Sequence, residues 1–240
     1  VPPFLGFFAK LVVIQAALGL VLLAVISNTR ADPDLWGHVL FGRDTVASGH
    51  LSTADTYSFT SDRSWINHEW LAECAMFLTF ALGGGPGLVI LKILAVLVAV
   101  GFVWSGLNRQ QVDPSARNVL VALTIVATFP QTNHVRPQLF SIVAFASLLW
   151  LLVADRSLWR LAVIPLVFAL WVNLHGGWIV GGGVLAVWSL ATLLANVARV
   201  EKVMLFASGV VSLLATLVNP YGWRMWLFLQ QTVGFGRAEI

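Results

Sequence analysis

Two carboxylates stand close together in the stretch ADPDLWGH, shortly after an apolar run that ends at Ile26. Asp32 and Asp34 are separated only by Pro33. A carboxylate in such a place can bind a cation, or it can take the proton of a hydroxyl group as a general base. We therefore predict that Asp34 is a catalytic base and that Asp32 supports it; the structural alternative for Asp32 is a helix cap.

Other side chains able to take part in chemistry recur in the polar connections further along the chain. Two prolines bracket His134 and Arg136 in FPQTNHVRPQLF, and a basic pair of this kind suits an anionic group such as phosphate. His175, in WVNLHGGW, is an ionisable residue near hydrocarbon and hence a candidate for function, unless a neighbouring carbonyl satisfies it. The predicted substrate-binding residues are His38, His68, Glu69, His134, Arg136 and His175.

Several familiar sites are missing from the sequence. It has no Walker loop, dinucleotide fingerprint, nucleophile elbow or zinc-binding histidine pair on one helix turn. The single cysteine, Cys74, excludes an internal disulfide and a thiolate zinc cluster. The run GGGPG lacks the Lys and Ser/Thr of a phosphate loop, and we interpret it as the end of one helix and the start of another at Pro86.

The elements that must position these residues are membrane helices. Hydrophobic residues make up 58% of the chain and charged residues 10%, with a mean hydropathy of +0.85, whereas soluble domains have about 25% charged residues. The net charge of +3 then bears on membrane orientation, and we predict no nucleic-acid partner. The composition predicts an all-α, polytopic helical bundle.

Windows near the ~20 apolar residues needed to cross a bilayer predict about seven transmembrane helices. They fall at about 5–27, 87–107, 118–133, 139–154, 160–174, 178–198 and 203–218. The apolar stretch 71–82 carries Glu73 and is short, so we predict that it lies at the interface and does not cross. The predicted organisation is an anchor at 1–27, an outer loop with surface helices at 28–85, and a bundle at 86–240.

The long first loop is expected to carry two amphipathic surface helices. Asp32 can cap a helix that starts at Pro33 and stops at Gly49, and Asn67 can cap a second one. Basic residues near short connections favour the opposite side of the membrane as the cytoplasmic one, and all five histidines fall on the side of this loop. We predict a multi-pass protein of the plasma (inner) membrane with the loop 28–85 extracytoplasmic.

The order of these features resembles the GT-C superfamily of membrane glycosyltransferases, which includes oligosaccharyltransferase catalytic subunits, protein O-mannosyltransferases and aminoarabinose transferases. The likeness lies in a first span followed by the acidic loop ADPDLWGHVLFGRDTVASG, the surface segment SWINHEWLAECAMF and a bundle with polar outer turns. The chain is also similar to bacterial multispanning proteins of unassigned function that carry DPDLW, NHEWLAE, VRPQLF, NLHGG and NPYG.

The resemblance implies transfer of a sugar from a polyprenyl-phosphate donor at the outer membrane face, with Asp32 or Asp34 as the base or metal ligand. The second outer loop carries NHVRPQ where oligosaccharyltransferases have a further acidic motif, which disfavours a metal-dependent mechanism and leaves the cofactor undetermined. The expected partners are membrane lipid and the donor. The alternative is a non-catalytic subunit of a larger membrane complex; a transporter ranks third, because no inverted repeat is visible.

Overall fold

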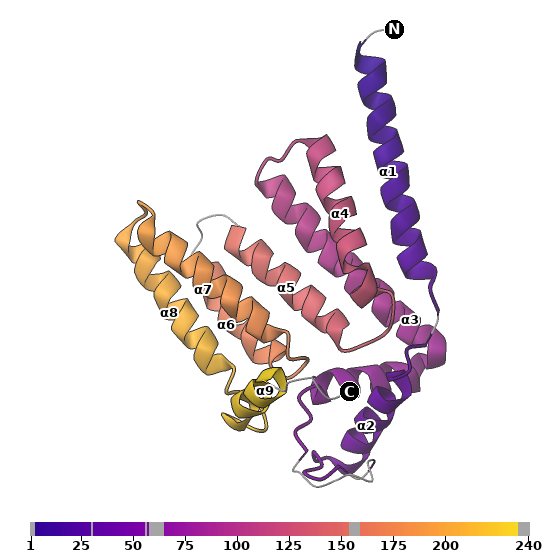
Figure 1. The fold of residues 1–240 in the computed structure, drawn as a ribbon, viewed down its shortest axis with the longest axis vertical. Coiled ribbons are helices and arrows are strands. Elements are labelled where there is room, and N and C mark those ends of the chain that lie inside the picture. The colour runs from indigo at the N-terminus through magenta and orange to yellow at the C-terminus, as the bar shows by residue number, and fades with distance from the viewer. Residues whose placement is uncertain (1–2, 30, 56, 58–64, 154–158, 235–240) are drawn as a thin grey trace. The chain divides into compact units, whose positions relative to one another are not determined.

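A computed structural model of the chain describes residues 3–29, 31–55, 57, 65–153 and 159–234 (Figure 1). Over these residues the regular elements are helices and no β-strand occurs, which confirms the all-α prediction. They are α1 (Pro3–Ser27), α2 (Leu35–Ser48), α3 (Trp70–Arg109), α4 (Pro114–Thr132), α5 (Gln138–Val153), α6 (Trp159–Trp171), α7 (Trp178–Leu194), α8 (Arg199–Ala215) and α9 (Arg224–Gly234).

The helices lie close to the predicted segments. Each predicted apolar window coincides with one of α1, α3, α4, α5, α6, α7 and α8, whereas α9 was not predicted. Within the described part of the chain one helix, α3, is long and apolar enough to cross a membrane. Four shorter apolar helical stretches of 10–17 residues accompany it: α5, α6, α7 and the part Val12–Leu22 of α1.

Helix α3 contains a kink at the glycine run. Gly84 has φ 58° and ψ −148°, a backbone conformation that is essentially restricted to glycine, and Pro86 lies just beyond it inside the helix. The sequence predicted the end of one helix and the start of another here. The structure agrees, because the helical segments before and after the glycine run meet at a kink whose backbone at Gly84 is not helical.

The chain forms two compact units, each made of segments that are distant in sequence. Unit 1 comprises Val1–Trp36 and Thr79–Arg156, and unit 2 comprises Gly37–Leu78 and Ser157–Ile240. The boundaries therefore fall inside α2 and α3. The predicted division at 27 and 85 followed sequence order, while the compact units interleave along the chain.

Unit 1 is held together by apolar contacts among α1, α3 and α4. Val96, Val121 and Ile125 form its buried centre, and Val21 and Leu22 of α1 pack against them. Helix α4 also contacts α5. The end of α3 is fixed by cation–π contacts, with the Arg109 guanidinium 4.3 Å from the Trp150 ring and that of Arg117 4.3 Å from the Trp104 ring.

Unit 2 is built on α8, which packs against both α6 and α7 (Figure 1). The Ser208 hydroxyl of α8 donates to the carbonyl of Leu161 in α6 at 2.6 Å, where both groups are shielded from solvent. Phe168 and Trp171, also on α6, have ring centres 5.9 Å apart and are almost completely buried. A small hydroxyl residue lets the two helix backbones approach closely, as is typical of helix pairs in membranes.

Asn173, at the end of α6, joins three segments of unit 2. Its Oδ1 accepts a hydrogen bond from Trp70 Nε1 at 3.0 Å, and its backbone carbonyl accepts one from the Leu71 N–H at 3.1 Å. Its Nδ2 donates to the carbonyl of Val218 at 2.8 Å. One buried amide thus fixes the start of α3 relative to the ends of α6 and α8.

The Gly84 conformation predicts an effect of substitution that differs sharply between adjacent positions. A Cβ at Gly84 has room, since its nearest neighbour is Pro86 Cδ at 3.9 Å, but the positive φ remains strained for any L residue. Gly84→Ala should therefore lower the free energy of unfolding by about 1–3 kcal/mol. Gly85→Ala, with no atom within 4 Å of its Cβ, should leave it unchanged or raise it. Thermal unfolding of the two variants in detergent measures the difference, and equal midpoints would contradict it.

Candidate functional site

Seven of the eight predicted site residues fall in two clusters, one in each unit. The aspartate–arginine cluster, in unit 1, consists of Asp32, Asp34 and Arg136. The histidine–glutamate cluster, in unit 2, consists of His38, His68, Glu69, Glu73 and His175. Glu73 belongs to the second cluster although it was not predicted, and the eighth predicted residue, His134, lies outside both clusters.

In the aspartate–arginine cluster, one guanidinium nitrogen meets both carboxylates. Arg136 Nη2 lies 2.7 Å from Asp32 Oδ1 and 2.8 Å from Asp34 Oδ2. The Asp32 side chain is 7% exposed and that of Asp34 67% exposed, so the two carboxylates have different environments. Asp32 is a fixed, buried partner of the arginine, whereas Asp34 is open to solvent and to a ligand.

The turn before α2 places the two carboxylates. Asp32 Oδ1 accepts the N–H of Asp34 at 3.0 Å, and the carbonyl of Asp32 accepts the N–H of Leu35 at 3.1 Å. Asp32 therefore caps this turn, as the sequence predicted, although α2 begins two residues after the predicted start at Pro33. Burial raises the pKa of Asp32, but the hydrogen bonds from Arg136 and the Asp34 N–H outweigh it and hold the pKa below its usual value.

A buried lysine fixes the turn that carries Arg136. Lys92 Nζ donates to the backbone carbonyls of Asn28 and Asn133, and Asn28 Nδ2 donates to the same Asn133 carbonyl at 3.1 Å. These hydrogen bonds join Asn28, directly after α1, to the connection between α4 and α5. His134 lies in this connection, and its charge acts to lower the pKa of Asp32.

The aspartate–arginine cluster does not fit a metal ion. The cationic guanidinium already stands between the two carboxylates at hydrogen-bonding distance from each. A divalent cation held by Asp32 and Asp34 would face this charge at close range, and like charges repel. The arginine suits this cluster to an anionic ligand instead.

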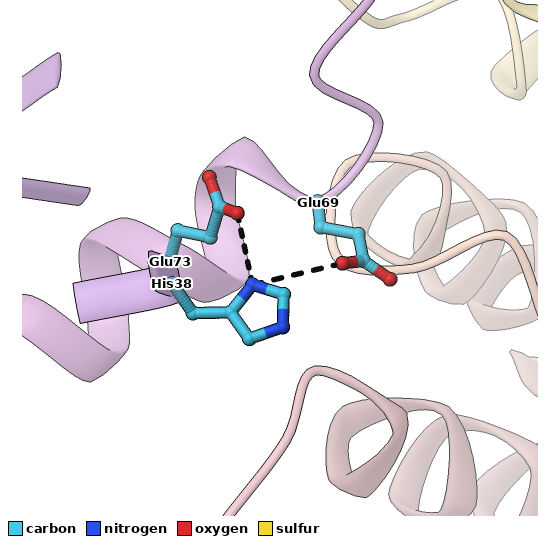
Figure 2. Close-up of side chains that lie close together, drawn as sticks. All are labelled: His38, Glu69 and Glu73. Carbon is cyan, nitrogen blue, oxygen red and sulfur yellow. Dashed lines mark hydrogen bonds and ion pairs between the residues drawn. The ribbon is translucent and has the colours of Figure 1, made fainter. Parts of the chain in front are cut away.

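In the histidine–glutamate cluster, His38 of α2 lies between two carboxylates of the segment that starts α3 (Figure 2). His38 Nδ1 is 3.0 Å from Glu73 Oε1 and 3.9 Å from Glu69 Oε2. The other oxygen of Glu69, Oε1, is 3.5 Å from His68 Nε2 and 3.4 Å from His175 Nε2. Glu69 is therefore shared among three histidines.

Close packing of α2 on α3 brings His38 to Glu73. A Cβ added at Gly42 would lie 2.1 Å from the Glu73 carbonyl oxygen, so only glycine allows this approach. Asn67 orients the carboxylates, since its Oδ1 accepts the Glu69 N–H at 3.1 Å and its Nδ2 donates to Glu73 Oε2. The hydroxyl of Tyr221 in turn accepts the Asn67 N–H at 3.1 Å.

His68 and His175 are neutral bases in this environment. Burial, with a smaller contribution from the charge of neighbouring histidines, lowers the pKa of each imidazole to about 4. The His68 ring packs against the backbone next to His175, since a Cβ added at Gly176 would lie 3.7 Å from that ring and 3.3 Å from Leu229. The two imidazoles can accept or relay a proton, or donate one N–H each to Glu69.

Sequence reasoning missed Glu73, Asn67 as a carboxylate partner, and Lys92. Glu73 had a usable signal, because Glu69 and Glu73 are four residues apart and therefore share one helix face. It was interpreted only as an obstacle to membrane crossing. Lys92 was not predicted to have a structural role, although it is 1% exposed and donates hydrogen bonds to two turns.

Unit 2 also contains a cavity of about 500 Å³ between α7 and α8. Its walls are mainly apolar, with Trp178 and Trp226 in edge contact, ring centres 4.7 Å apart, at one end. The buried Ser212 hydroxyl on this wall has no hydrogen-bond partner among the described residues. A cavity of this size and chemistry is suited to a hydrocarbon chain.

No family model, curated protein or solved structure matches this chain.

The depressed histidine pKa values predict a pH dependence of stability. Unfolded histidine has a pKa of about 6.5, so between about pH 6.5 and 4 the unfolded chain binds protons that folded His68 and His175 do not. Their stabilisation is complete above about pH 6.5 and decreases as the pH falls toward 4. Lowering the pH from 7 to 5 should therefore reduce the free energy of unfolding by about 1–2 kcal/mol for each of the two histidines.

Denaturation of the detergent-solubilised protein at the two pH values measures this loss. His68→Gln and His175→Gln should each reduce the difference between pH 7 and pH 5. His50→Gln, which replaces an exposed histidine just after α2, should leave this difference unchanged. A wild-type pH dependence in both of the first two variants would show that the two imidazoles do not control it.

Proposed function

We propose that this chain is a multi-pass membrane glycosyltransferase that transfers a sugar from a polyprenyl-phosphate donor at the outer face of the plasma membrane. The observation that carries the proposal is the aspartate–arginine cluster. It combines a solvent-exposed carboxylate, Asp34, with an arginine that a second, buried carboxylate holds in place. A general base next to a phosphate-binding group is what sugar transfer from a phosphate donor requires.

Arg136 has capacity for a further anion. Its Nη2 bonds both aspartates, but its Nε is buried and has no hydrogen-bond partner among the described residues. A buried unpaired donor is costly, and a phosphate oxygen would satisfy it with a charge-assisted hydrogen bond. Asp32 stays with the guanidinium and keeps it oriented while the phosphate binds.

The proposed reaction then follows from the release of Asp34. Binding of the donor phosphate at Arg136 competes with the Asp34 ion pair and frees its exposed carboxylate. Asp34 accepts the proton of an acceptor hydroxyl as the hydroxyl oxygen bonds to the anomeric carbon of the sugar. The bond between that carbon and the phosphate oxygen breaks, and the polyprenyl phosphate leaves with the electron pair, stabilised by Arg136.

The membrane part of the proposal is supported by apolar side chains on the outside of the helices. In addition to α3, helices α5, α6 and α7 are apolar along their length. Large apolar residues on α6, α7 and α8 are open to the surroundings, among them Leu166, Val187 and Phe206, with exposed fractions of 67%, 71% and 63%. Lipid is the solvent that accepts such surfaces, which supports several crossings.

The second candidate is a non-catalytic subunit of a larger membrane complex. The same ion pairs that orient Arg136 also join the turn before α2 to the connection between α4 and α5. Under this alternative the cluster is structural, and Asp34 serves only as a second partner of the arginine. The two candidates differ in what loss of the Asp34 charge does.

Asp34→Asn distinguishes the two candidates. If Asp34 is the base, the variant should fold and bind donor but transfer sugar ~10²-fold more slowly or worse, because a general base typically contributes at least this much. Arg136→Ala should weaken donor binding before it lowers turnover at saturation. Release of polyprenyl phosphate from labelled lipid-linked sugars, in proteoliposomes containing purified protein, measures both effects.

The control is Asp44→Asn, at an aspartate of α2 whose partners are Arg43 and Tyr57. This variant should retain the wild-type rate. Normal turnover of Asp34→Asn would exclude the base role. Absence of a co-purifying polyprenyl phosphate by mass spectrometry, together with stoichiometric partner subunits, would favour the structural alternative.

The proposed orientation makes a separate prediction about the first loop. In a Cys74→Ala background, Ala54→Cys should react with an impermeant maleimide added to intact cells, because residue 54 is exposed and belongs to the loop 28–85. Asn196→Cys, in the exposed connection between α7 and α8, should react only after lysis. The reverse pattern would invert the proposed topology.

A further inference from the structure

We propose that His38, Glu69 and Glu73 bind one divalent transition-metal ion in unit 2. Their ligand atoms, one imidazole nitrogen and one oxygen from each carboxylate, all lie within 4.8 Å of one another. Figure 2 shows His38 Nδ1 directed toward both carboxylates. The proposal concerns residues other than Asp32, Asp34 and Arg136, so it stands or fails independently of the proposed sugar transfer.

The carboxylate oxygens that do not face His38 are held by other groups. Glu73 Oε2 accepts from Asn67 Nδ2, and Glu69 Oε1 faces His68 Nε2 at 3.5 Å and His175 Nε2 at 3.4 Å. Each glutamate thus directs one oxygen to the common centre and bonds a donor with the other. Metal-ligating carboxylates are typically oriented by outer hydrogen bonds of this kind.

His175 belongs to this outer set and not to the ligands. Its Nδ1 accepts the backbone N–H of Gly177 at 3.0 Å, so the proton of the neutral ring is on Nε2. Nε2 is therefore a donor toward Glu69 Oε1 and has no lone pair for a metal. The backbone turn at Gly177 selects the tautomer that orients Glu69.

Charge balance favours a cation at the centre of the cluster. The side chains of Glu73 and Glu69 are 4% and 13% exposed, and that of His38 is 16% exposed. Two carboxylates in so little water are costly unless positive charge compensates both. A divalent ion bound by the imidazole and by one oxygen of each carboxylate would compensate both negative charges.

The donor set indicates the class of ion. Imidazole nitrogen favours first-row transition metals such as Zn²⁺ or Fe²⁺, and carboxylate oxygens also suit Mn²⁺, while Mg²⁺ and Ca²⁺ prefer oxygen alone. Three protein ligands leave at least one coordination position for water or an oxygen ligand, as in metal sites that are not purely structural. The ion would also join α2 to the start of α3.

Metal binding by the purified full chain tests the proposal directly. After chelation and dialysis, Zn²⁺ titrated calorimetrically should bind with a stoichiometry of one per chain, and a large excess of Mg²⁺ should not displace it. With Mn²⁺ as the probe, pulsed electron paramagnetic resonance should show hyperfine coupling to one imidazole nitrogen, which changes on ¹⁵N-histidine labelling. Absence of stoichiometric Zn²⁺ binding and of nitrogen coupling in the wild-type protein would overturn the proposal without any variant.

Variants locate the site. Glu73→Gln, Glu69→Gln and His38→Gln should each weaken Zn²⁺ binding by at least tenfold, and His38→Gln should abolish the nitrogen coupling. Glu201→Gln, at a glutamate of the same unit that pairs with Arg160 at 3.6 Å, should bind as the wild type does. Unchanged affinity in the three ligand variants would show that the ion binds elsewhere and would refute the assignment.

A glycine pair tests the geometry without changing a ligand. Gly42→Ala must separate α2 from the Glu73 backbone, so it should weaken Zn²⁺ binding about 10–100-fold, the scale of outer-shell defects. Gly37→Ala, whose Cβ meets only the Phe41 ring at 3.8 Å, should have no effect. Equal affinities in these two variants would contradict a site made jointly by α2 and α3.

Discussion

The buried carboxylate of Glu73 is the constraint on which the described part of unit 2 depends. It lies in a helix apolar enough to cross a membrane, where an unpaired polar or charged group costs several kcal/mol. Its two oxygens are met by His38 and Asn67, and Asn67 is fixed by Tyr221. The absence of a side chain at Gly42 is part of the same solution, because only then does α2 come close enough to supply the histidine.

Unit 1 also contains a buried charged side chain in α3, but this one, Lys92, is a cation. Its ammonium group donates hydrogen bonds to the carbonyls of Asn28 and Asn133. These carbonyls belong to the segments that lead to the aspartates and to Arg136. A polar group that must be satisfied inside apolar surroundings fixes the backbone around it. Lys92 in unit 1 and Asn67 in unit 2 accordingly position the groups proposed to bind ligands, although neither is itself proposed to contact one.

The helices were predictable because their signals are local. Apolar length, the capping aspartate before α2 and the glycine at its end, where Gly49 has φ 70°, can all be deduced from adjacent residues. The pairing of Arg136 with Asp32 and Asp34 joins positions about a hundred residues apart, for which sequence offers only complementary charge. The partner of Glu73 could not be predicted, because a carboxylate in an apolar run indicates either an interface or a buried partner, and only the fold shows His38 beside it.

The two clusters differ in the kind of ligand that they can accept, and this difference comes from the residue that lies between the two carboxylates of each. Both contain two carboxylates, one of them nearly buried. In unit 1 the residue between them is an arginine, which stays positively charged and leaves a donor for an anion. In unit 2 it is a histidine, which can release its proton and present a lone pair to a cation. Two similar acidic pairs are thereby suited to opposite charges, the first to phosphate and the second to a metal ion.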